Sequence, residues 1–176
     1  MFIAVPISEL KVKYLTKTDD VLLELNRAVA DYVKNVHPFR YKNKTFRLID
    51  NYVASPYMKC DVCGHYPTFE VSVIENDNGE MLRAGTDCIN RLTEQSISEW
   101  FRSFRRKRQI IMANRKYIDQ LPLILNAQNR KAPSFQIPEG DAENLKVMVE
   151  QMYNGLNPTA RQEQIADCYM CIKAKA

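Results

Sequence analysis

Three of the five cysteines in this chain have the spacing of a metal site. Cys60 and Cys63 are separated by two residues and followed by Gly64, and Cys88 stands after a segment with the pattern of a β-hairpin. A Cys-x-x-Cys turn directs two sulfurs at one ion, and a glycine just after it can take positive φ. The sequence therefore predicts a structural zinc site with Cys60, Cys63 and Cys88 as ligands.

The residues before Cys88 have the pattern of a strand end, a close backbone approach at Gly85 and the first turn of a helix. Unpaired N–H groups at a helix N-terminus favour negative charge. We therefore expect the pKa of Cys88 to be lowered, which favours the thiolate that zinc binding needs.

Two other interpretations of these cysteines remain open. Cysteine is often buried as a small apolar residue without any metal. A redox Cys-x-x-Cys pair normally begins a helix after a strand, whereas a hairpin pattern follows Cys63. The ligand-like spacing of three cysteines favours the metal site over both.

The sequence leaves the fourth ligand open. A treble-clef-like site takes its last two ligands from one helical turn, but the position three residues after Cys88 is Arg91, which cannot bind a metal ion. Cys168 and Cys171 have the spacing of one helical face, where they would also pack well beside apolar neighbours. The candidates for the fourth ligand are Asp87, His65, His37, Cys168 and Cys171.

The first half of the chain must supply the strands that position this site. Strand patterns occupy residues 2–5, 10–15, 46–53 and both sides of Asn78-Gly79. A helix with an apolar stripe is expected from Thr18 until His37-Pro38. In the hairpin, residues 69–73 alternate as in a half-exposed strand, with Phe69 on the apolar face and Glu70 on the opposite one.

Helices are expected in the second half. Ser96 to Glu99 has the pattern of a capping box, and Pro122 limits the helix that follows. The sequence predicts an α+β fold, in which a small zinc-bound hairpin unit stands between an N-terminal strand and helix and C-terminal helices. Its parts are an α+β zinc-bearing domain (1–95), a basic amphipathic helix (96–125), a linker (126–140) and a C-terminal helical pair (141–176).

The predicted helix over 96–125 concentrates positive charge. A basic helical face neutralises phosphates and releases their counterions, which gives salt-dependent binding to DNA or RNA. A solvated or internally paired surface and an acidic protein partner are the alternatives. The candidate nucleic-acid-binding residues are Arg102, Arg105, Arg106, Lys107, Arg108, Arg115 and Lys116.

A second basic segment lies just before the cysteines. Residues 39–47 alternate cations with Phe39, Tyr41 and Phe46. Interleaved aromatic and cationic side chains are typical of surfaces that bind single strands.

Composition sets the class of protein. The chain has 176 residues, of which 45% are hydrophobic and 26% charged, as expected of a globular protein and not of a disordered one. It shows no pattern of a signal peptide and no run of about 20 apolar residues. With an odd number of cysteines, this indicates a cytoplasmic protein with reduced thiols and no membrane partner.

The sequence shows no set of catalytic residues. Only two histidines are present, and no phosphate-binding loop, nucleophile elbow or His-Glu-x-x-His helix occurs. Without a positioned acid, base and nucleophile, we expect a non-enzymatic protein with no small-molecule substrate.

Residues 46 to 92 carry a resemblance. The Cys-x-x-Cys-Gly turn at Cys60 and the Gly-x-x-Cys ending at Cys88 resemble the small zinc segments of many phage, plasmid and archaeal-virus proteins. This resemblance implies an accessory protein of a mobile element with a structural zinc. The leading expectation is a zinc protein that binds nucleic acid, and the alternative is a protein-interaction module, such as a polymerase accessory subunit or an inhibitor of a host factor.

Overall fold

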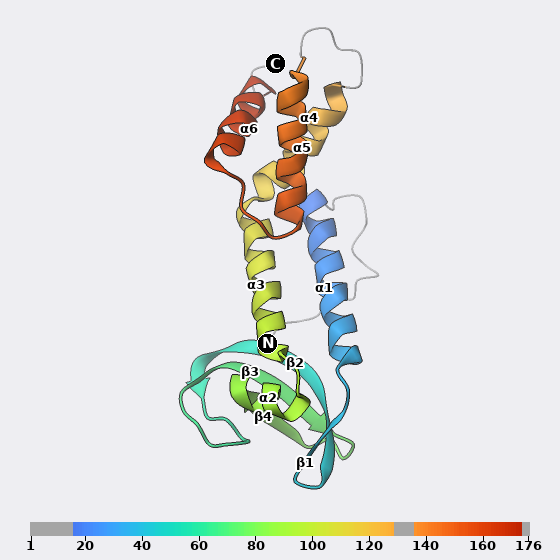
Figure 1. Ribbon diagram of the computed structural model, residues 1–176, viewed down its shortest axis with the longest axis vertical. Coiled ribbons are helices and arrows are strands. Elements are labelled where there is room, and N and C mark those ends of the chain that lie inside the picture. The colour runs from blue at the N-terminus through green and yellow to red at the C-terminus, as the bar shows by residue number, and fades with distance from the viewer. Residues whose placement is uncertain (1–15, 129–135, 174–176) are drawn as a thin grey trace. The chain divides into compact units, whose positions relative to one another are not determined.

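The computed structural model describes residues 16–128 and 136–173, and Figure 1 shows their arrangement as helices and a sheet. The fold is α+β, as the sequence predicts. The elements are α1 (Lys17–Asn35), β1 (Phe39–Tyr41), β2 (Lys44–Met58), β3 (Thr68–Asn76), β4 (Met81–Gly85), α2 (Thr86–Thr93), α3 (Ile97–Ala113), α4 (Arg115–Gln128), α5 (Glu139–Tyr153) and α6 (Ala160–Lys173). The strands predicted for residues 2–5 and 10–15 lie outside the described residues.

The chain divides into two compact units. The sheet unit is Leu25–Arg106, which contains every strand named above together with α2. The helical unit is formed by the described residues of Met1–Glu24 and Lys107–Ala176. Each unit is described by itself below.

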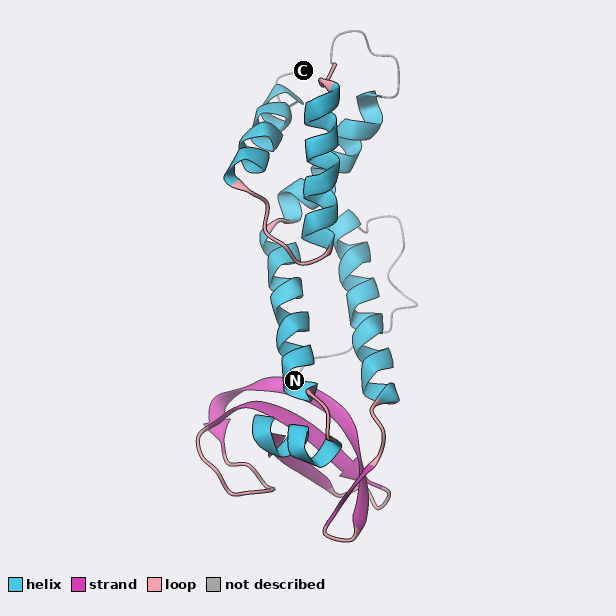
Figure 2. Ribbon diagram, in the orientation of Figure 1, coloured by secondary structure: helices cyan, strands magenta, loops and turns pink. Residues whose placement is uncertain are grey.

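The sheet is antiparallel with the strand order β1-β2-β3-β4, and Figure 2 shows its strands in magenta. The turn between β3 and β4 is the predicted one. The side-chain oxygen of Asn76 accepts hydrogen bonds from the amides of Asn78 and Glu80, both at 3.0 Å, and Gly79 has a φ of +77°. Strand β1 was not predicted, because three residues are too few to show a period.

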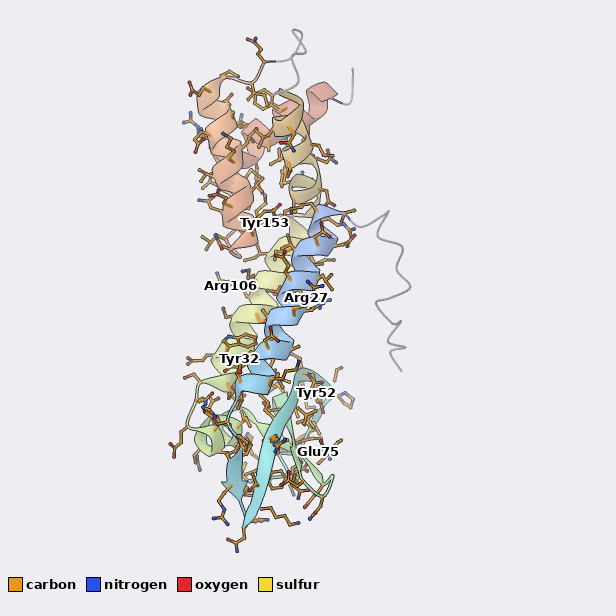
Figure 3. All side chains as sticks on the ribbon, turned by 90° about the vertical axis from the view of Figure 1, so that its right-hand side faces the viewer. Arg27, Tyr32, Tyr52, Glu75, Arg106 and Tyr153 are labelled. Carbon is orange, nitrogen blue, oxygen red and sulfur yellow. The ribbon has the colours of Figure 1, made fainter. Side chains whose placement is uncertain are left out.

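The core of the sheet unit lies between the sheet and its helices. Phe46, Ile74 and Ile89 are almost fully buried, from β2, β3 and α2 respectively. On the side of α1, Tyr32 stacks on Trp100 of α3 with ring centroids 3.7 Å apart, and Figure 3 labels Tyr32. The apolar packing of Phe46, Ile74 and Ile89 holds α2, which carries Cys88, against the sheet.

In the helical unit, α4, α5 and α6 pack against one another around apolar side chains from each. The phenol of Tyr169 in α6 donates a hydrogen bond to Asp141 in α5 at 2.6 Å. Gly155, with a φ of +76°, follows the end of α5, and the amide of Leu156 donates to the carbonyl of Gln151 as in a glycine-ended helix.

Helix α1 begins slightly earlier than the predicted start at Thr18, and α6 begins in the same way as α1. Thr16 is the N-terminal cap of α1. Its hydroxyl accepts a hydrogen bond from the amide of Asp19, and the Asp19 carboxylate accepts one from the amide of Thr16. Thr159 and Gln162 form the same reciprocal pair at the start of α6. Both are capping boxes, which satisfy two amides that a helix start otherwise leaves free.

The basic helix predicted over 96–125 is two helices in the structure. Helix α3 ends at Ala113, and the side-chain amide of Asn114 donates to the carbonyl of Ile110 at 2.8 Å. Such a bond competes with the helix backbone. Helix α4 then continues past Pro122 to Gln128, so this proline does not limit the helix, and residues 129–135 of the predicted linker lie outside the described residues. None of the helices in the described part of the chain is long and apolar enough to cross a membrane.

Candidate metal centre

The structure brings the three predicted zinc ligands together. The sulfurs of Cys60, Cys63 and Cys88 all lie within 4.8 Å of one another. Zinc–thiolate bonds of about 2.3 Å in a tetrahedron separate the sulfurs by about 3.8 Å, so small side-chain adjustments suffice for one ion to bind all three. These residues therefore form a group that fits a metal ion, as the cysteine spacing predicts.

The Cys-x-x-Cys turn has the backbone geometry that directs its sulfurs to one point. The amide of Gly64 donates to the carbonyl of Cys60 at 2.8 Å, and the amide of Cys60 donates to the carbonyl of His65 at 2.9 Å. Gly64 has a φ of +77°, which only glycine adopts without strain. The turn is thus closed by hydrogen bonds of its own backbone.

The two edge strands of the sheet, β4 and β1, hold this turn in place. The amide of Asp61 donates to the carbonyl of Arg83 in β4, and the Asp61 carboxylate accepts from the amide and the guanidinium of Arg83, at 2.8 and 3.2 Å. From β1, the hydroxyl of Tyr41 donates to the carbonyl of Val62 at 3.2 Å. The cysteine turn is therefore tied to both edges of the sheet.

Gly85 lies at the closest approach of the backbone to the cysteines. Its amide donates to the sulfur of Cys60 at 3.2 Å. A Cβ at this position would lie 3.2 Å from Cγ2 of Thr68 and 3.9 Å from Cβ of Cys60, so an added side chain would press on Thr68. The close backbone approach expected at Gly85 is confirmed.

The pKa of Cys60 lies below its ordinary value of 9.0. Burial raises the pKa of this thiol, but hydrogen bonds from the backbone amides of Gly85, Cys63 and Val62 more than offset burial, because they stabilise the thiolate. Cys60 is thus the sulfur whose anionic form the protein itself stabilises.

The prediction of a lowered pKa for Cys88 was wrong. Cys88 does stand in the first turn of α2, but burial, followed by hydrogen bonds with the sulfurs of Cys63 and Cys60, raises its pKa to about 12. A buried sulfur beside two others keeps its proton, and the helix N-terminus does not outweigh that. A bound divalent cation supplies the positive charge that three adjacent thiolates need.

None of the fourth-ligand candidates joins the three sulfurs within the part of the chain that is described. Every cysteine and histidine of the sequence is in that part. Cys168 and Cys171 are exposed on α6, and His37 follows α1. His65 and Asp87, in contrast, line the same pocket as the three cysteines.

This pocket has a volume of about 510 Å³ and lies within the sheet unit. Arg102 and Arg105 of α3 also line it. Both bind the buried carboxylate of Glu70, Arg102 at 2.9 Å and Arg105 at 2.8 Å, and Arg105 also donates to Asn51 at 2.6 Å. The pocket is thus lined by a cysteine cluster and by two arginines that share one carboxylate.

Glu70 is the site residue that the sequence pattern missed. Its alternation with Phe69 predicted an exposed carboxylate and a buried ring, but Glu70 is buried and Phe69 is 53% exposed. A carboxylate survives burial when it is paired and hydrogen-bonded. Its partners come from α3, so only the tertiary structure brings them to it.

Four of the seven candidate nucleic-acid-binding residues make ion pairs inside the protein. Besides Arg102 and Arg105, Arg115 binds Asp19 and Asp119, and Lys116 binds Asp167. The other three, Arg106, Lys107 and Arg108, have no carboxylate partner within the described residues. Of the three aromatic residues of the second basic segment, Phe39 and Phe46 are buried and offer no ring to a ligand, whereas Tyr41 is half-buried.

No family model, no curated protein and no solved structure matches this chain.

Proposed function

We propose that the cysteine group binds a structural zinc ion in a treble-clef-like unit, and that the protein binds nucleic acid and has no catalytic activity. The proposal of a metal site rests on the three sulfurs, which lie within 4.8 Å of one another. Two of the sulfurs come from the Cys-x-x-Cys turn, and the third comes from the helix that follows the hairpin. Thiolates with this geometry are typical zinc ligands.

His65 is the fourth ligand in this proposal. Of the five candidates, only His65 and Asp87 line the pocket into which the sulfurs open. Imidazole completes closed zinc sites together with three cysteines more commonly than carboxylate does. The His65 side chain is exposed, so it is free to rotate toward the ion while its carbonyl keeps the bond from the amide of Cys60.

The nucleic-acid half rests on the three cations that the protein does not neutralise. Arg106, Lys107 and Arg108 are consecutive in α3, and Arg106 and Arg108 are exposed; Figure 3 labels Arg106. Within the described chain no carboxylate pairs with any of the three. Unpaired guanidinium groups suit phosphate, because their planar fork matches two of its oxygens.

The test is a titration of labelled single-stranded and double-stranded DNA and RNA with the zinc-loaded protein across a range of salt. Affinity should fall steeply as salt rises, because phosphate contacts release counterions. Arg106→Gln and Arg108→Gln should each reduce the slope of log K against log salt by about 1. Arg161→Gln is the matched control, since Arg161 is exposed on α6, away from the basic residues of α3 in the sequence.

Two outcomes would contradict the proposal that the protein binds nucleic acid through these cations. Absence of binding to all four probes at low salt leaves the alternative, an interaction module that uses the basic helix against an acidic protein. Equal effects of the Arg161 and Arg106 substitutions would show that only net charge matters. The resemblance to zinc segments of mobile elements supports an accessory role beside phage or plasmid nucleic acid.

A further inference from the structure

An exposed aromatic pair lies beside the metal centre. The rings of Tyr57 in β2 and Phe69 in β3 have centroids 4.4 Å apart, and the two residues are 52% and 53% exposed. Phe69 lines the 510 Å³ pocket together with Val53, which is 60% exposed. An exposed group of large apolar side chains at a pocket commonly marks a binding site.

The wall made by α3 carries positive charge. Arg102 and Arg105 share the single carboxylate of Glu70, which leaves one positive charge in excess beside α3, while Asp87 lines the pocket from α2. Arg102 binds Glu70 through Nε, its side chain is 57% exposed, and its two terminal nitrogens donate no hydrogen bond to any described residue. Arg105 is held by Glu70 and Asn51, so it positions the carboxylate that in turn positions Arg102.

We infer that this pocket takes an unpaired base of single-stranded nucleic acid, which stacks on Phe69 while Arg102 contacts the adjacent phosphate. Its volume of about 510 Å³, which also includes the position of the ion beside the sulfurs, is within the range of small-ligand pockets. Base stacking on exposed aromatic rings beside arginine is how proteins bind single strands with little sequence preference. Bases inside a duplex are stacked on each other, so a duplex has no free base to offer the pocket.

This inference rests on the proposed nucleic-acid binding and makes it specific. It gives the role of single-strand contact to Phe69, against which Tyr57 packs, in place of the buried rings of Phe39 and Phe46. It also explains why a carboxylate is buried at Glu70, since this residue fixes an arginine at the pocket without removing all of its charge.

The experiment measures binding of fluorescently labelled oligothymidine, an abasic strand of equal length and a duplex of equal length to the full zinc-loaded protein. Phe69→Ala should weaken binding of oligothymidine by about 5- to 150-fold, the effect of one lost stacking contact. Binding of the abasic strand and of the duplex by this variant should stay unchanged. The Phe69→Trp variant, which keeps an aromatic ring, should bind oligothymidine as the unmodified protein does. Because Phe69 is exposed, the variant should fold, which retention of zinc verifies.

Met81→Ala is the matched control, because Met81 is also an exposed large side chain of the sheet unit but does not line the pocket. Its affinity for oligothymidine should equal that of the unmodified protein. An equal loss for oligothymidine and the abasic strand, or no loss with Phe69→Ala, would overturn the base pocket while nucleic-acid binding stands. Failure of every probe to bind at low salt would instead overturn the proposed function.

Discussion

The amide of Gly85 donates a hydrogen bond to the sulfur of Cys60 at 3.2 Å, which links the end of β4 to the cysteine turn. This bond contributes to the lowered pKa of Cys60, and a side chain at residue 85 would press on Thr68 beside it. The metal centre therefore depends on a backbone position as well as on its three sulfurs.

Gly85→Ala should destabilise the protein by about 1–3 kcal/mol, because the added Cβ must push Thr68 or the cysteine turn aside. We expect weaker zinc retention in competition with a chelator, together with the lower free energy of unfolding. Gly140→Ala provides the control, since no atom lies within 4 Å of a Cβ at Gly140 and alanine favours the helix there. Equal stability of the two variants would show that the close approach at Gly85 is unimportant.

Cys63→Ser separates a metal site from buried cysteines. Cys63 is exposed, so without a metal its substitution should change the free energy of unfolding by less than about 0.5 kcal/mol. With a structural zinc, the variant should lose its metal and the order of the hairpin, because the binding energy of the ion is folding energy. Elemental analysis and circular dichroism measure both, and Cys168→Ser and Cys171→Ser should retain zinc. Full metal content in the Cys63 variant would refute the proposed ligand set.

His65→Ala should change the visible absorption spectrum of the Co²⁺-loaded protein, because the spectrum reports the donor atoms around the ion. We expect metal affinity to fall by at least about tenfold, since even the loss of an outer-shell partner has that effect. Asp87→Asn is the comparison, as Asp87 lines the same pocket. A spectral change in the Asp87 variant alone would reassign the fourth ligand to that carboxylate.

Asp19 should stabilise the start of α1 in a pH-dependent way. Hydrogen bonds from the Thr16 hydroxyl and amide, aided by Arg115, hold the pKa of Asp19 below its ordinary value of 3.8. A lowered pKa gives stability that is present above pH 3.8 and is lost as the pH falls through the folded-state value. Asp19→Ala should lower the free energy of unfolding by about 1 kcal/mol at neutral pH.

Chemical denaturation of both proteins between neutral and acidic pH measures this effect. The difference between the unmodified protein and Asp19→Ala should shrink as the pH falls below 3.8. Asp31→Ala, in an exposed position of the same helix, should give no such trend. A difference that stays constant down to low pH would mean that the charge of Asp19 contributes nothing.

The sequence alone determined the features that depend on neighbouring residues. The spacing of Cys60 and Cys63, the positive φ at Gly64 and the turn at Asn78-Gly79 are all local, because backbone geometry over a few residues limits what each segment can do. Cys88 could also be assigned, since its distance from the hairpin puts it in the first turn of the next helix.

Only the tertiary structure decided which side chains are buried and which charges are paired. Glu70 is buried because Arg102 and Arg105 reach it from α3, and the pKa of Cys88 is raised because two other sulfurs lie beside it. Interactions between segments far apart in the chain leave no mark on local periodicity. Burial and charge pairing at this site follow from those interactions, so no pattern in the sequence could reveal them.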